Sequence, residues 1–189
     1  ERLTGKCSAR FGDVHVIDNG PFALGWAFTV NQEVTVSALG AFDIAGNGHP
    51  AGQQVRLYNR TDDSVLVTAT IGDAATPETV GGYNVYYQSI APLTLTTGVE
   101  YIVASSNGVN NDICNTLSLT HAAAIDPTGS VATLFDPNLP ASVSGFAITG
   151  SNPQDLYLGA QLKLVPEPSA ISLLLAGFFG LVCYAWRKR

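Results

Sequence analysis

Hydrophobic and polar residues alternate in short runs over most of the first 164 residues of the chain. Such runs, rich in β-branched and aromatic residues, predict strands. We expect strands at residues 13–17, 26–30, 34–44, 54–59, 65–71, 83–90, 99–105, 116–119, 144–149 and 155–164. Turn-forming Gly, Asn and Asp residues separate several of the runs. The spacing predicts an all-β body, an antiparallel β-sandwich of jelly-roll type.

The run at residues 155–164 shows the clearest alternation. One face carries Leu156, Leu158, Ala160, Leu162 and Leu164, and the other carries Tyr157, Gly159, Gln161 and Lys163. One apolar face and one polar face are typical of an antiparallel strand with one side in water. We therefore expect a last strand with a wet face, leading directly into the C-terminal segment.

The pattern changes completely at residues 169–186, which are eighteen mostly apolar residues without a charge. A helix of this length spans about 27 Å, close to the thickness of a hydrocarbon core of about 30 Å. Tyr184 and Trp186 stand at its end, before the basic tail of Arg187, Lys188 and Arg189. The positive-inside rule places such a tail in the cytoplasm. We predict a C-terminal transmembrane helix with the body outside; a buried core helix, the alternative, would carry a polar stripe.

Composition and charge narrow the function classes. Charged residues make up 13% of the chain, against roughly a quarter in typical soluble domains. Residues 1–164 hold six Lys and Arg against fourteen Asp and Glu, a net charge of 6 − 14 = −8. An acidic body does not neutralise phosphates, so we expect no nucleic-acid partner. The chain contains no Met, and we expect an export signal to have been removed from the N-terminus.

Pro166, Glu167 and Pro168 precede the apolar segment and the basic tail. This order resembles the PEP-CTERM sorting signal of Gram-negative bacteria. The resemblance implies an exported protein, held first in the inner membrane with a cytoplasmic C-terminus and then processed by an exosortase, a membrane-embedded cysteine transpeptidase or protease. The two prolines also favour an extended, accessible linker. We therefore divide the chain into a body at 1–164, a linker at 165–169 and a sorting helix at 170–189.

Residues 24–105 carry a second resemblance, in the order of their strand-like runs. The runs at 36–43, 55–58, 65–70 and 90–98 follow one another as in DUF4082-like domains, which are common in PEP-CTERM proteins. The resemblance implies a β-sandwich that meets a partner outside the cell. It supplies no catalytic residues.

The three cysteines fall in two environments. Cys183 lies in the predicted helix, where we expect a plain apolar role. Cys7 and Cys114 are alone in the exported body, and an oxidising compartment favours a disulfide between them. Closing a loop of about 108 residues would stabilise the fold by roughly 4–5 kcal/mol. Two separate thiols are the alternative.

The sequence contains no recognisable catalytic motif. The histidines His15, His49 and His121 lack metal-binding spacing, and no nucleophile elbow or phosphate loop occurs. We therefore expect a protein that is not an enzyme and that needs no cofactor. Calcium is the one candidate ion, because oxygen-bearing side chains gather in one loop, at Asn107, Asn110, Asn111 and Asp112. Asp43 and Asn47 flank a second candidate loop.

Two functions from different classes remain. The first is a surface or matrix structural protein that contributes to biofilm and self-assembles. Ser172, Ala176 and Gly180 recur every fourth residue, a spacing that allows helices to pack closely. The second is a carbohydrate-binding module displayed to extracellular polysaccharide. Its aromatic candidates are Trp26, Tyr83, Tyr86 and Tyr87.

Overall fold

The computed structural model describes residues 23–43, 46, 48–49, 51–72, 75–80, 83–106, 114–116, 122–133, 136, 138–150, 156–165 and 186–187. These residues form twelve strands and one 3₁₀ turn: β1 (Ala23–Val30), β2 (Val34–Asp43), β3 (Gln54–Asn59), β4 (Ser64–Thr70), β5 (Pro77–Val80), β6 (Tyr83–Leu95), β7 (Glu100–Ser106), β8 (Cys114–Thr116), β9 (Ile125–Ala132), η1 (Val143–Gly145), β10 (Ala147–Gly150), β11 (Leu156–Leu158) and β12 (Ala160–Leu164). The prediction of a mainly antiparallel β body is confirmed.

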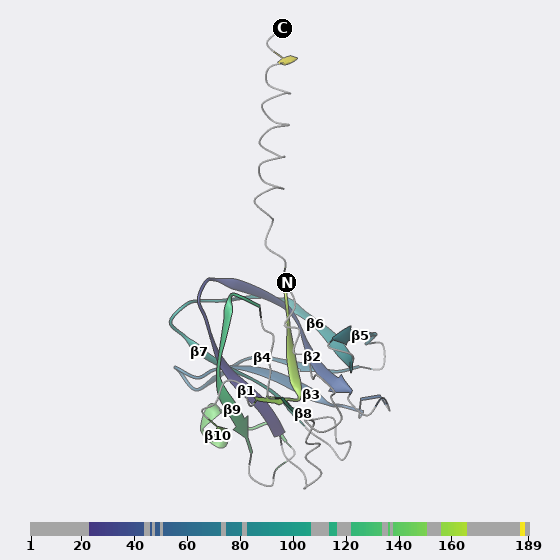
Figure 1. Cartoon of the computed structure of the whole chain (residues 1–189), viewed down its shortest axis with the longest axis vertical. Helices are drawn as coiled ribbons and strands as arrows, with labels where there is room; N and C mark the ends of the chain where they lie inside the picture. Colours follow the sequence, from purple (N-terminus) through teal and green to yellow (C-terminus); the bar gives the residue numbers. More distant parts are fainter. Residues whose placement is uncertain are drawn as a thin grey trace.

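The strands form two larger sheets and one small one (Figure 1). The six-stranded sheet has the order β10-β9-β1-β7-β3-β4, and the four-stranded sheet has the order β12-β2-β6-β5. β11 pairs with β8 in a two-stranded sheet. The indole N–H of Trp26 on β1 donates to the carbonyl of Ala160 on β12 at 3.0 Å, so this hydrogen bond joins the two larger sheets.

The main core lies between the two larger sheets and follows the alternation of β1. Trp26 and Phe28 point inward with ring centroids 4.8 Å apart, and Phe28 lies 5.6 Å from the ring of Tyr101 on β7. Each large side chain buried in this way contributes roughly 1.5–3 kcal/mol to folding. Gly25 directly precedes Trp26 on β1, and a Cβ there would stand 2.1 Å from the carbonyl oxygen of Val103. Only glycine fits at this position.

A second, smaller core lies on the opposite face of the six-stranded sheet. Its buried members are Ala23, Ala27, Tyr58, Ile102, Ala104, Val131 and Leu139, with Val143 and Phe146 packed against them. Leu139, Val143 and Phe146 come from the segment between β9 and β10. This segment therefore covers the outer face of the sheet.

Six predicted strands agree with observed ones within a few residues at one or both ends, those at 26–30, 34–44, 54–59, 65–71, 83–90 and 99–105. The run at 116–119 meets β8 only at Thr116, and residues 117–119 lie outside the described residues. The run at 155–164 is not one strand, because it breaks at Gly159 and its halves join different sheets. Its polar face is only partly wet, since Gln161 is 1% exposed whereas the side chain of Lys163 is 34% exposed. The run at 144–149 begins inside the 3₁₀ turn rather than in a strand. The run at 13–17 lies outside the described residues.

Two observed strands were not predicted, β5 and β9. β5 begins with Pro77, and β9 contains Pro127 and Gly129. The predicted C-terminal helix lies outside the described residues except for Trp186 and Arg187, which are helical and exposed. Among the residues that the structure describes, none of the helical segments has the length and apolar character needed to span a membrane.

Candidate functional site

The aromatic residues expected to bind sugar do not form a platform. Trp26 is 1% exposed and belongs to the core, so the prediction that it stacks on a sugar ring is wrong. Tyr83 and Tyr87 share one face of β6, and alternation places Tyr86 on the other face. The three tyrosines therefore cannot present coplanar rings to one ligand.

The rings of Tyr86 and Tyr87 on β6 already contact other residues of the body. The ring of Tyr86 meets that of His49 edge to face at 4.8 Å. The ring of Tyr87 lies against Gly40, where a Cβ would stand 2.7 Å from it. Lys163 Nζ lies 5.3 Å from the centroid of the Tyr87 ring, and this ammonium also pairs with Glu78. A sugar would have to displace this cation from Tyr87.

The predicted ion sites and the disulfide fall mostly on residues that are not described. Asn107, Asn110, Asn111, Asp112 and Asn47 lie outside the described residues, as do Cys7 and Cys183. Cys114 is in β8, where its backbone pairs with Leu158. Asp43 is 2% exposed and its Oδ2 accepts a hydrogen bond from the backbone N–H of Gly48 at 3.2 Å, so it closes its own loop. Within the described part of the chain no three His, Cys, Asp or Glu side chains gather as a metal site.

The sorting motif also lies outside the described residues, at Pro166, Glu167, Pro168, Lys188 and Arg189. The described chain leads directly to it. β12 ends at Leu164, and the backbone N–H of Val165 donates to the carbonyl of Thr35 at 2.7 Å. The body is therefore hydrogen-bonded up to the residue that precedes Pro166.

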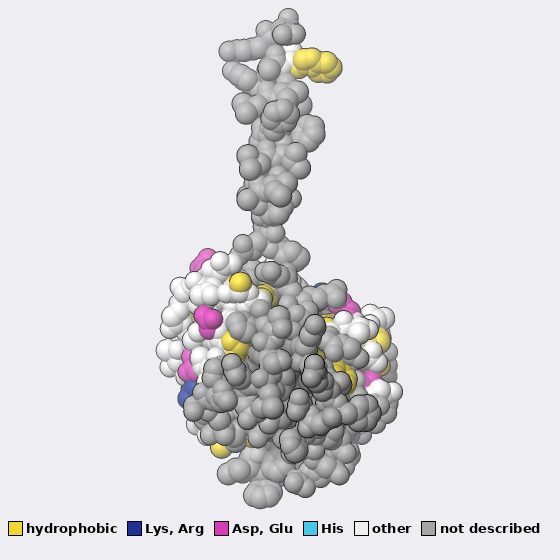
Figure 2. All heavy atoms as spheres, viewed as in Figure 1, with side chains coloured by type: hydrophobic (Ala, Val, Ile, Leu, Met, Phe, Trp, Pro, Cys, Tyr) yellow, Lys and Arg dark blue, Asp and Glu magenta, His cyan; other side chains and the backbone are white. Residues whose placement is uncertain are grey.

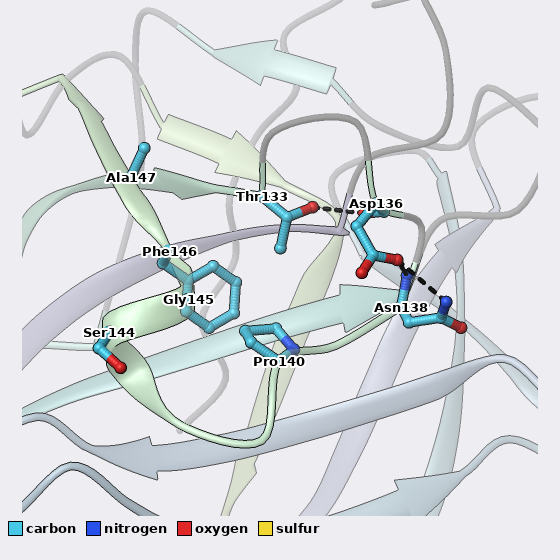
Figure 3. A pocket seen from close by; sticks show the side chains of 8 residues that line it. All are labelled: Thr133, Asp136, Asn138, Pro140, Ser144, Gly145, Phe146 and Ala147. Atoms are coloured by element: carbon cyan, nitrogen blue, oxygen red, sulfur yellow. Dashed lines mark hydrogen bonds between the residues drawn. The ribbon is translucent and has the colours of Figure 1, made fainter.

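An open pocket of about 410 Å³ lies beside the segment that joins β9 to β10. Figure 3 shows its lining residues, which are Thr133, Asp136, Asn138, Pro140, Ser144, Gly145, Phe146 and Ala147. Except for Ala147, the first residue of β10, the lining residues come from the connection rather than from a strand. The pocket is thus built by a loop that rests on the six-stranded sheet.

A hydrogen-bonded turn holds the polar side of the pocket. The hydroxyl of Thr133 accepts from the backbone N–H of Ala23 at 2.9 Å and donates to the carbonyl of Asp136. Asp136 Oδ1 accepts from both the backbone N–H and the side-chain amide of Asn138, at 2.8 and 2.9 Å. The side chains of Asp136 and Asn138 are exposed at the pocket. Together they offer a carboxylate and an amide that can accept from and donate to the hydroxyl groups of a ligand.

Two side chains of β3 fix the floor beneath this loop. Arg56 Nη1 donates to the carbonyls of Leu139 and Pro140 at 3.0 and 3.1 Å. The hydroxyl of Tyr58 donates to the same carbonyl of Pro140 at 2.9 Å, and its ring meets Phe146 edge to face at 5.3 Å. Burial raises the pKa of Tyr58 to about 12, although Arg56 acts in the opposite direction. The hydrogen bonds from Arg56 and Tyr58, together with the ring contact to Phe146, therefore hold the loop on the sheet.

The lining of the pocket offers both polar groups and an aromatic ring to a ligand. Among the described lining residues, Asp136 is the one carboxylate. The half-buried ring of Phe146 and the exposed Asp136 and Asn138 suit a small polyhydroxy ligand. Sequence reasoning missed the pocket because its lining forms no motif. The one signal was the turn-forming sequence around Asn138, which has a proline on each side within two residues.

Residues 164–189 match the family model of the PEP-CTERM protein-sorting motif. The match confirms the resemblance seen at Pro166, Glu167 and Pro168, and it begins at Leu164, the last residue of β12. No curated protein matches the chain. The resemblance of residues 24–105 to DUF4082-like domains stays a prediction.

Proposed function

We propose that this chain, an exported protein sorted to the cell surface through its PEP-CTERM motif, is a structural component of the bacterial surface or extracellular matrix. The observation that carries the proposal is the direct junction between the β body and the motif at Leu164. Such a junction suits a body that is displayed as a rigid unit.

The described packing of β12 is made with residues of the body that precede the motif. Leu162 and Leu164 of β12 are buried in the main core, and Lys163 pairs with Glu78 of β5. The last described contact before the motif is the hydrogen bond from Val165 to Thr35. Removal of everything after Val165 therefore leaves these contacts intact, as a protein that is processed at this place requires.

The proposed route begins in the inner membrane. Residues 169–186 cross it as a helix, with Arg187, Lys188 and Arg189 in the cytoplasm, until an exosortase cuts or transfers the body near Pro168. A jelly-roll arrangement of the two larger sheets and a disulfide between Cys7 and Cys114 belong to the same proposal. Both suit a small domain that works outside the cell.

The test is the location of the protein in its host. Surface, matrix and inner-membrane fractions are compared for the wild type, for a variant with Pro166, Glu167 and Pro168 replaced by Ala, and for a Glu33→Ala control. Glu33 is an exposed residue between β1 and β2. We expect the wild type and the control in the surface and matrix fractions, and the motif variant in the inner membrane. Equal delivery of all three to the surface would contradict the proposed route.

A second candidate function is binding of extracellular polysaccharide, and the pocket beside Phe146 favours it. The polar pair of Asp136 and Asn138 next to an aromatic ring is the specific observation. Affinity electrophoresis in gels that contain the host polysaccharide measures this binding. We expect Asp136→Asn to weaken retardation, while Asp126→Asn, a change at an exposed residue of β9, leaves it unchanged. Equal retardation of both variants and the wild type would exclude the pocket as the binding site.

A further inference from the structure

The free edges of the two larger sheets differ in how they are protected against pairing with another strand. An edge strand presents unpaired backbone N–H and C=O groups, and proteins usually block such edges with proline, charge, bulges or short length. β5 has four residues and begins with Pro77 and Glu78. β10 also has four residues, with a register shift before Gly150, and β12 carries Lys163. The part of β6 that extends beyond β5 contains Pro92.

β4 forms the remaining edge and has no proline, glycine or charged residue in its seven residues. In the described part of the chain it pairs only with β3. Thr68 and Thr70 are exposed, and Val65 is 37% exposed. Leu66 and Val67 are half-buried against the main core, so a neighbouring strand would cover more of their apolar surface. The register shift with β3 lies near the start of β4, which leaves residues 67–70 in regular pairing.

The turn before β4 holds this edge in place. Asp62 accepts hydrogen bonds from the backbone N–H of Ser64 at 3.1 Å and from the side chain of Asn59 at 3.0 Å. Asp63 adopts a φ of 61° and accepts a hydrogen bond from the backbone N–H of Ser144 at 3.0 Å. The hairpin is thus fastened to the loop that covers the sheet. An edge that is already ordered loses little entropy when a strand pairs with it.

We propose that β4 pairs in antiparallel fashion with β4 of a second copy of this chain. This inference rests on the proposed structural function and names the surface through which copies join. Pairing centred on Val67 places Ser64 opposite Thr70, Val65 opposite Ala69 and Leu66 opposite Thr68. The two outer pairs match polar with polar and apolar with apolar. The two six-stranded sheets then form one continuous sheet across a two-fold axis. Main-chain hydrogen bonds supply the affinity in this mode of recognition.

A second copy fits this edge better than a foreign strand that bears charges. β4 offers no charged side chain to pair with one, whereas two copies of β4 present only hydroxyl and apolar groups to each other. Electrostatic repulsion between the bodies opposes the pairing, because residues 1–164 carry a net charge of −8. Figure 2 shows acidic side chains scattered over the described part of one face rather than gathered in one patch. Salt screens such repulsion, so pairing through β4 strengthens as ionic strength rises.

The experiment uses the full-length chain in a mild detergent, as an equal mixture of ¹⁴N- and ¹⁵N-labelled protein. Thr68 is replaced by the photoreactive p-benzoylphenylalanine, and cross-linked peptides are identified by mass spectrometry. We expect mixed-isotope pairs that join residue 68 of one copy to the β4 peptide of the other, with a higher yield at an ionic strength of about 0.15 M than at about 0.01 M. The same photoreactive residue at Thr79, an exposed position on β5, is the control and should give no such pair.

A charge at the edge provides a second test in the same assay. Thr70→Glu places a carboxylate opposite Ser64 of the second copy, near its Asp62, and should lower the mixed-isotope yield about tenfold or more because like charges in an interface are strongly unfavourable. Thr79→Glu on β5 should leave the yield unchanged. Light scattering on the same samples separates the inference about β4 from the proposed structural function. Assembly with cross-links elsewhere than β4 overturns the edge inference but keeps the structural function, whereas a monomer under all conditions contradicts self-assembly as well as the edge.

Discussion

Removing one hydroxyl group, in Tyr58→Phe, gives a sharp test of how the loop is held on the sheet. The ring of Tyr58 is fully buried and stays in place in the variant, so packing against Phe146 is preserved. The lost hydrogen bond is the one to the carbonyl of Pro140, which still accepts from Arg56. Because no buried acceptor is orphaned, we expect a loss of about 1 kcal/mol in the free energy of unfolding near pH 7.

The sign of this difference reverses at high pH. The pKa of Tyr58 is about 12 in the folded protein, against 10.0 for an ordinary tyrosine, mainly because burial disfavours the phenolate. A raised pKa leaves stability intact below pH 10 and removes it as the pH rises from about 10 through about 12. Two units correspond to about 3 kcal/mol, and the phenylalanine variant is spared this loss. We therefore expect the stability curves of the two proteins to cross near pH 11.

Urea unfolding at a series of pH values measures both effects, with the fluorescence of the buried Trp26 as the signal. Subtracting one protein from the other removes the ionisations that both share. Parallel curves from pH 7 to pH 12 would refute the assignment of Tyr58 as a buried, neutral hydrogen-bond donor. A loss well above 3 kcal/mol at pH 7 would show that the hydroxyl does more than bind Pro140.

Three further predictions concern the body, and urea unfolding checks each of them. Leu162→Ala on β12 should cost about 2–5 kcal/mol, whereas Val165→Ala, at a residue that is 43% exposed, should stay within about 0.5 kcal/mol; equal losses would contradict the burial of β12. A chain that ends at Val165 should be as stable as the full-length chain, and one that ends at Leu158 should not fold, because the buried leucines of β12 alone contribute roughly 3–6 kcal/mol. Gly25→Ala should destabilise the body through its clash with Val103, and an unchanged midpoint would disprove the close approach of β1 and β7.

Local patterns in the sequence were enough to predict the strands whose neighbours along the chain end in clear turns. β3 lies between Gly52 and the polar turn at Asp62, and its observed bounds are those predicted. β1 illustrates both the strength and the limit of the pattern. Its inward residues alternate with small ones such as Gly25 and Ala27, a signal that Trp26 belongs to the core, yet the expectation of an exposed tryptophan came from its use in sugar binding. Packing in the folded protein, rather than the use of tryptophan in sugar binding, determines that Trp26 is buried.

Other features depend on residues far apart in the sequence, and no local pattern announces them. β9 forms because it pairs with β1 about 100 residues away, despite Pro127 and Gly129. The pocket needs Arg56 and Tyr58 to hold a loop more than 80 residues further along the chain. Gln161 was expected in water because it alternates with leucines, but both faces of β12 are buried there. The sorting motif, by contrast, is local and short, so sequence alone was enough to identify it.

The intact mass of the protein from its native host tests whether the chain is sorted through its C-terminal motif. We expect material released from the membrane to lack the residues after Pro168, while its body remains whole through β12. The mass would then fall short of the full-length value by the apolar segment and the basic tail, with any group transferred in their place added. A full-length mass in the released material would contradict sorting through the motif.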